Sequence, residues 1–225
     1  MNVRLYVWQR LTAAIMAPLV LAHIVVIFYA TRKGLSAADI LARTRGSFAW
    51  ASFYGAFVVA AAIHATIGVR NVLTEWSPLE DRGAGMLAGV FGVLLFFARR
   101  ARGRRSGAAM NLRHLRHRES VLWIAALVHR LSGLALAVFL PVHFLTLGLA
   151  IRGEAPLESF LRWSDQPLVK LAESALIFLL MLHMLGGLRL LVIENLPWRD
   201  GQKQAATIAA GLSAAIAFFL LARML

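Results

Sequence analysis

The sequence predicts an all-α membrane protein, a polytopic bundle of five spanning helices with one short extra helix, built by internal duplication. Two observations support this fold class. The chain is 60% hydrophobic, more than a typical soluble domain. Its longest stretches without Asp, Glu, Lys or Arg hold 19 to 24 residues, and about 20 apolar residues cross a bilayer as a helix. These stretches are residues 11–31, 46–69, 131–151 and 204–222.

Six helices are expected along the chain. Four follow the charge-free stretches, and a fifth carries its charges towards its ends. A sixth apolar segment, residues 83–98, is too short to cross comfortably, so we expect an interfacial or re-entrant helix there. Residues 31–47 and 152–167 are expected to be loops. The helices are predicted at residues 11–30, 48–74, 84–98, 121–151, 168–192 and 205–225.

The chain repeats itself. Residues 9–23, QRLTAAIMAPLVLAH, align with residues 129–143, HRLSGLALAVFLPVH, at an offset of 120. Residues 64–75, HATIGVRNVLTE, align with residues 183–194, HMLGGLRLLVIE, at an offset of 119. We therefore predict a first copy at residues 1–98, an arginine-rich linker at 99–118 and a second copy at 119–225.

The charge distribution predicts the topology. The net charge is +13, and the linker at 99–118 holds eight arginines and no acidic residue. Such a run is typical of a cytoplasmic loop that contacts anionic lipid, so we do not expect nucleic-acid binding. If the two copies run parallel through the membrane, an even number of spanning helices must separate the equivalent helices of the copies. Residues 84–98 should therefore not cross the bilayer. The N-terminus is then cytoplasmic.

Each copy carries one histidine on its first helix and one on its second. The repeat aligns His23 with His143 and His64 with His183. Neutral imidazole is the usual axial ligand of a b-type haem, and two facing helices can clamp one iron. We expect two stacked haems about 13 Å apart along the membrane normal, with His64/His183 nearer the cytoplasm. The alternatives are structural histidines or a proton relay.

Further residues follow these histidines at matched spacings. Gly68 and Gly187 lie four residues later, where a missing side chain admits either a flat macrocycle or a neighbouring helix. Arg70 and Arg189 lie six residues later, where they could pair with haem propionates or reach the interface.

Polar residues near the start of each copy suggest other roles. Arg10 and Arg130 are similar candidates for propionates. His129, which aligns with Gln9, is expected to be a polar interfacial residue and not a ligand. Glu173, the acid inside a predicted helix, could exchange protons with a quinone or pair with Lys170.

The chain contains no cysteine. It therefore cannot hold an iron–sulfur cluster, a disulfide or a covalently attached haem. It also lacks a strand–GxGxxG–helix unit for a dinucleotide. Flavin or iron–sulfur chemistry must lie on partner chains.

Four motifs carry a resemblance to the cytochrome b membrane anchors of succinate dehydrogenases and fumarate reductases. These are QRLTA at 9–13, HATIGVRNVLTEW at 64–76, HRLSG at 129–133 and HMLGGLRLLVIEN at 183–195. The resemblance covers most of the chain except 83–118. It implies haem b, quinone as substrate, and flavoprotein and iron–sulfur partners at the cytoplasmic face of a bacterial inner membrane.

The first half is similar to the smaller anchor of two-anchor enzymes and the second half to the larger one. The chain therefore looks like a fusion of both. In single-chain, two-haem members, a histidine on each of four helices ligates, and the first-helix histidines follow an arginine by thirteen residues. Arg10–His23 and Arg130–His143 have this spacing. In single-haem members, the resemblance implies His64 and His183 alone.

The resemblance also implies a quinone site near the cytoplasmic face, lined by a serine and a tyrosine. Ala126 and Trp76 occupy those positions here. Arg130 and Trp76 could line a modified site, and Glu173 is the alternative on the outer side.

These observations favour an anchor that passes electrons between an iron–sulfur partner and a membrane quinone. Two other hypotheses remain open. One is a single-haem or haem-free anchor with a cytoplasmic-side quinone site. The other is a small membrane transporter built on repeats.

Overall fold

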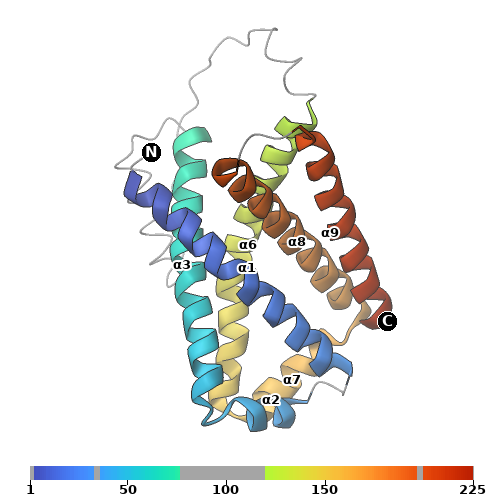
Figure 1. Cartoon of the computed structure of the whole chain (residues 1–225). Coiled ribbons are helices and arrows are strands. Elements are labelled where there is room, and N and C mark those ends of the chain that lie inside the picture. Colours follow the sequence, from blue (N-terminus) through green and yellow to red (C-terminus); the bar gives the residue numbers. More distant parts are fainter. Residues whose placement is uncertain (1–2, 33–35, 77–119, 197–199, 225) are drawn as a thin grey trace, which may run out of the picture.

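The computed structural model describes residues 3–32, 36–76, 120–196 and 200–224. These residues form helices joined by short turns (Figure 1). The predicted short helix at 84–98 and the linker at 99–118 lie outside the described residues. The helices are α1 (Val3–Arg32), α2 (Ala37–Thr44), α3 (Phe48–Trp76), α6 (Val121–Arg152), α7 (Glu154–Ser164), α8 (Pro167–Asn195) and α9 (Gln202–Met224).

Five of the helices are long and apolar enough to cross a membrane. They are α1, α3, α6, α8 and α9, with spans of 23 to 30 residues. This confirms the predicted bundle of five spanning helices, and the chain is an integral membrane protein. The first helix begins at Val3 instead of residue 11. A charge-free criterion placed its start too late, because arginines near a membrane boundary are accommodated without ending a helix.

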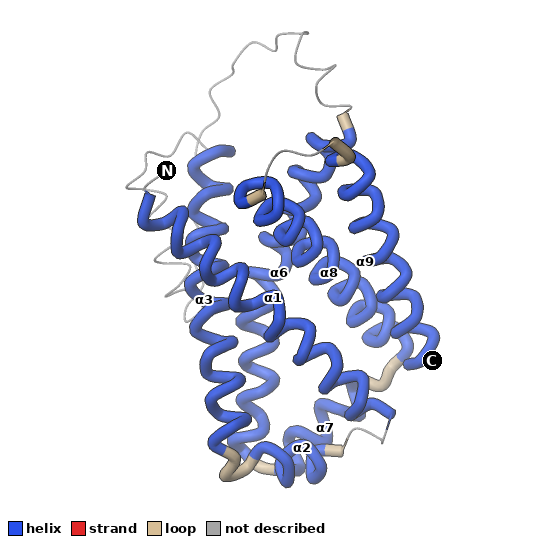
Figure 2. Tube along the Cα trace, in the orientation of Figure 1, coloured by secondary structure: helices blue, strands red, loops and turns tan. Residues whose placement is uncertain are grey.

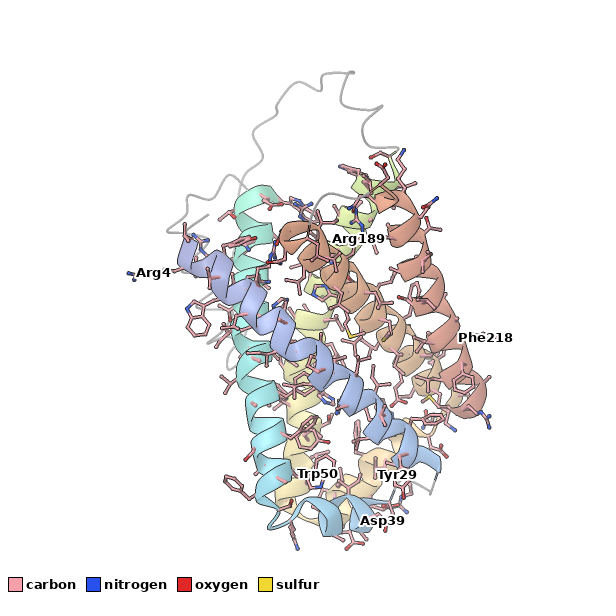
Figure 3. All side chains as sticks on the ribbon, viewed as in Figure 1. Arg4, Tyr29, Asp39, Trp50, Arg189 and Phe218 are labelled. Atoms are coloured by element: carbon pink, nitrogen blue, oxygen red, sulfur yellow. The ribbon has the colours of Figure 1, made fainter. Side chains whose placement is uncertain are left out.

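The spanning helices pack against one another in a bundle, with α9 beside α8 (Figure 2). Within the first copy α1 packs on α3, and within the second α6 packs on α8. Across the copies α3 contacts α6 and α1 contacts α8, while α9 lies against α8 and α6. Small side chains such as Ala60, Ala137 and Ser213 are buried at these contacts, as is usual between membrane helices. Large apolar side chains such as Phe218 point outward (Figure 3).

The predicted loops at 31–47 and 152–167 each contain a short helix, which corrects the expectation. The α2 helix begins after Ser36, whose hydroxyl oxygen accepts the Asp39 amide at 3.1 Å. This Ser-x-x-Asp spacing is a recognised N-terminal helix signal. The α7 helix supplies Glu158, whose carboxylate accepts the Ala37 amide at 3.1 Å. The two helices pack together around buried Leu157.

Candidate functional site

The four histidines of the repeat meet in two pairs, each with one member from either copy. The ring centroids of His64 on α3 and His183 on α8 are 6.0 Å apart, with planes at 82°. Those of His23 on α1 and His143 on α6 are 6.2 Å apart, at 75°. The first is called the linker-side pair, because it lies nearer the end where α3 stops and α6 starts. The second is the distal pair.

The imidazole of His64 is held by α1. The Thr12 hydroxyl donates to the Trp8 carbonyl at 2.7 Å, so its oxygen accepts from His64 Nδ1 at 3.3 Å. The proton on Nδ1 leaves Nε2 with a lone pair. In this structure Nε2 lies 3.3 Å from the Gln9 amide nitrogen. Ligation through Nε2 therefore requires the Gln9 side chain to turn away.

The imidazole of His183 has a matching arrangement on α6. Its Nδ1 lies 3.0 Å from the main-chain carbonyl of His129, which can only accept. The hydroxyl of Ser132, the residue equivalent to Thr12, lies 3.5 Å from the same nitrogen. Nδ1 therefore carries the proton and Nε2 is the potential ligand. A hydrogen bond of this kind is how proteins orient a metal-binding histidine.

His129 was expected at the interface, and the structure places it against the linker-side pair. Its ring stacks on His183 with centroids 4.2 Å apart and planes at 3°. Its Nδ1 is buried and has no hydrogen-bond partner among the described residues. A Cβ built on Gly187 would meet this ring at 3.4 Å, and one on Gly186 at 3.0 Å. The room left by Gly187 is thus taken by a side chain from the facing helix.

Gly68 has the equivalent relation to Gln9. A Cβ built on Gly68 would lie 3.6 Å from the Gln9 amide nitrogen. Gln9 Oε1 is buried and lacks a hydrogen-bond partner within the described part of the chain. The observed contacts of both glycines therefore agree with helix packing, the alternative to a macrocycle. Sequence reasoning passed over Gln9, Thr12 and Ser132, although the repeat had aligned them.

Aromatic side chains surround the distal pair. The His23 ring meets Tyr54 and Phe57 edge to face, at centroid distances of 6.0 and 5.6 Å. The His143 ring stacks on Phe139 at 5.3 Å. The Nδ1 atom of His23 is buried without a hydrogen-bond partner among the described residues. The linker-side pair is therefore oriented by polar groups and the distal pair by packing.

The predicted arginines have different surroundings. Arg10 forms an ion pair with Glu194, and Arg130 pairs with Glu75 at 2.6 Å. Each pair joins the first helix of one copy to the second helix of the other. The remaining two arginines lie on second helices. Arg189 bonds the main-chain oxygen of Gln202 at 3.3 Å and its side-chain oxygen at 3.1 Å, and Arg70 is half-buried on α3.

The candidate quinone residues lie towards opposite ends of the bundle. Trp76 ends α3 and is 49% exposed. It directly follows Glu75, the partner of Arg130, so the two predicted residues come to the same end. Glu173 is half-buried on α8, ten residues or about 15 Å before His183. Lys170, the partner that the sequence suggested for Glu173, forms a salt bridge with Asp165 at 2.8 Å.

The spacing of the histidine pairs fits one iron between two imidazoles. An imidazole nitrogen binds a transition metal at about 2 Å, so ring centroids on opposite sides of one ion lie roughly 6 Å apart. Both pairs meet this spacing. The described residues hold no group of three or more His, Cys, Asp or Glu suited to a metal ion. Two imidazoles per site are a donor set that could hold a haem iron.

Comparison with known proteins identifies the family. Residues 2–98 and 104–222 match the model described as the succinate dehydrogenase/fumarate reductase transmembrane subunit. The break between the two matched segments lies at the start of the predicted linker. No curated protein and no solved structure matched the chain. Because the match covers nearly the whole sequence, the chain belongs to the family of succinate dehydrogenase and fumarate reductase transmembrane subunits.

Proposed function

We propose that this subunit holds two b-type haems and passes electrons between an iron–sulfur subunit and membrane quinone. His64 and His183 would hold one haem, and His23 and His143 would hold the other. The observation that supports this proposal is the meeting of two histidine pairs, each across the copies, at 6.0 and 6.2 Å. Bound haem would supply reversible one-electron transfer through its iron.

The protein's own contribution differs between the two sites. At the linker-side pair, Thr12 and the His129 carbonyl would keep the protons on Nδ1 and leave Nε2 of each histidine as the potential ligand, with Gln9 turned away from His64. At the distal pair, the Tyr54, Phe57 and Phe139 rings restrict how the imidazoles turn.

The proposed partners follow from the family and from the composition. Because the chain has no cysteine to hold a cluster, the iron–sulfur centres would lie on a partner subunit. This subunit and a flavoprotein would bind the linker-side end. That end would face the cytoplasm, with the N-terminus and the arginine-rich residues 99–118 on the same side of a bacterial inner membrane. The apolar exposed side chains of the five spans would contact lipid. In this proposal the chain is a fusion of two anchors.

A quinone site at the linker-side end would use Arg130 and Trp76. The Arg130 guanidinium already binds Glu75, so a quinone oxygen would have to share or displace that contact. Glu173 is the alternative near the opposite end, where its carboxyl group could exchange a proton with the quinone.

The haem propionates also need cationic partners. Arg70 and Arg189 lie towards the linker-side ends of α3 and α8 and are the proposed ones. Arg10 and Arg130 are similar candidates, and each would have to share the carboxylate contact that it already makes. Gly68 and Gly187 would admit a macrocycle edge only if Gln9 and His129 moved.

Haem stoichiometry tests the proposal. The pyridine haemochrome assay on the purified subunit should give two haems per chain, and His23→Ala and His183→Ala should each lower this value to about one. One haem that survives His23→Ala but not His183→Ala would establish the single-haem anchor. A chain without haem in the native membrane would contradict the proposal and favour the haem-free anchor or the transporter, which substrate uptake would then distinguish.

A further inference from the structure

Two ion pairs join the copies near the linker-side pair, and one of them makes more contacts than the other. Arg10 binds Glu194 in two places: Nε donates to Oε2 and a terminal nitrogen donates to Oε1. Tyr6 adds a hydroxyl that donates to Glu194 Oε2 at 3.0 Å. The Arg10 guanidinium also lies over the Tyr6 ring, 4.9 Å from its centroid. Three side chains therefore form one closed group between α1 and α8.

The equivalent pair between α6 and α3 is simpler. Arg130 meets Glu75 through one oxygen at 2.6 Å, and the position equivalent to Tyr6 is Ala126. The side chains are also more exposed: 38% and 47% for Arg130 and Glu75, against 29% and 27% for Arg10 and Glu194. Solvent screens an exposed ion pair more than a shielded one. The two pairs thus occupy equivalent places but differ in their contacts and in their exposure to solvent.

The ion pair between Arg10 and Glu194 is connected to the surroundings of His64. Arg10 directly follows Gln9 and precedes Thr12 by two residues, and both neighbours contact the His64 imidazole. Glu194 belongs to α8, the helix that carries His183. We propose that Tyr6, Arg10 and Glu194 form a cross-copy lock, which holds the first turns of α1 against α8 and so positions the polar partners of His64.

The geometry of the lock indicates which substitutions it tolerates. A planar guanidinium binds both oxygens of a carboxylate at once, whereas a lysine ammonium acts as a point charge. Arg10→Lys should therefore weaken the lock although the charge is kept. The double variant Arg10→Glu with Glu194→Arg still places a guanidinium opposite a carboxylate. It should therefore restore much of the contact between α1 and α8. Tyr6→Phe removes the hydroxyl contact but keeps the ring under the cation.

Amide hydrogen exchange on the full chain in lipid nanodiscs tests the lock without depending on haem. Glu194→Gln should raise exchange of the amides in residues 5–12 about tenfold, because local opening of α1 loses a charge-assisted contact. The matched variant Glu75→Gln should leave these amides within about twofold of wild type. The exchanged-charge double variant should bring the α1 amides back to within about threefold.

The same variants separate the lock from the haem proposal. Should Glu194→Gln fail to fold, Tyr6→Phe serves instead, with an expected rise of about threefold at the same amides. Equal exchange in Glu194→Gln and Glu75→Gln across residues 5–12 would overturn the lock, and so would a charge exchange that restores nothing. A chain shown to bind no haem would leave this exchange pattern unaffected.

Discussion

Gly133 provides the sharpest test of how the linker-side pair is packed. A Cβ added at this glycine would lie 2.7 Å from Cε1 and 3.1 Å from Nδ1 of His183. The imidazole has little freedom to move, because its ring stacks on that of His129 with centroids 4.2 Å apart. Its Nδ1 is also bonded to the His129 carbonyl at 3.0 Å. Gly133→Ala should therefore displace the ring and break this hydrogen bond.

The expected magnitude follows from two opposing effects. Replacing glycine by alanine inside a helix normally stabilises it by about 0.5–1 kcal/mol. Overpacking a filled site costs about 1–3 kcal/mol. Gly148 lies on the same helix and has nothing within 4 Å of its added Cβ, so Gly148→Ala is the matched control. The gain from alanine applies to both variants and cancels, so they should differ by the overpacking cost, about 2 kcal/mol in unfolding free energy, with Gly133→Ala the less stable.

Thermal unfolding of both variants in one detergent measures this difference. For a chain of this size about 2 kcal/mol corresponds to a gap of roughly 5 °C in Tm. Haem content provides a second readout, since a displaced His183 should lower occupancy of the linker-side site in Gly133→Ala. The reasoning is refuted if Gly133→Ala matches Gly148→Ala in both Tm and haem content.

Three further predictions concern other contacts. Thr12→Val removes the oxygen that accepts from His64 Nδ1 and should lower linker-side haem occupancy more than Ser132→Ala does. After Ser132→Ala, the His183 Nδ1 still has a main-chain carbonyl at 3.0 Å. Equal losses of haem in the two variants would contradict this prediction. Leu157→Ala opens the cluster between α2 and α7 and should cost about 2–3 kcal/mol, seen as faster amide exchange in α2, and unchanged exchange would contradict it. Ser174→Ala removes a hydroxyl that donates to an α9 carbonyl at 3.0 Å and should lower stability by about 1 kcal/mol in denaturant titration, whereas no loss would show that this bond contributes little.

The spanning helices and the pairing of the histidines were predictable from the sequence, for physical reasons. A bilayer demands about 20 apolar residues per helix, so a charge-free run is a direct sign of a span. The repeat then placed His64 opposite His183 and His23 opposite His143, because parallel copies bring equivalent positions together. Their role as haem ligands stays a prediction.

The surroundings of the histidines were less predictable. His129 was predicted to be a polar interfacial residue because it differs from Gln9 of the first copy, and in the structure its ring stacks on that of His183. The ion pair between Arg10 and Glu194 joins different helices of different copies, and no local pattern reports such a contact. The short α2 helix does have a local signal, Ser36 three residues before Asp39, but it is too short to be found from the length of a hydrophobic run.

The pattern of symmetry suggests where the two copies have separate tasks. Facing copies of one unit make their contacts in equivalent pairs, as the two crossed ion pairs and the two histidine pairs do here. Departures from equivalence are therefore informative. Two of them, Tyr6 against Ala126 and Gln9 against His129, lie near the linker-side pair. That is also the end at which we propose the soluble partner binds. The Gln9 side chain is buried in the bundle and the His129 ring stacks on His183, so this divergence changes the surroundings of the two linker-side histidines and not the histidines themselves.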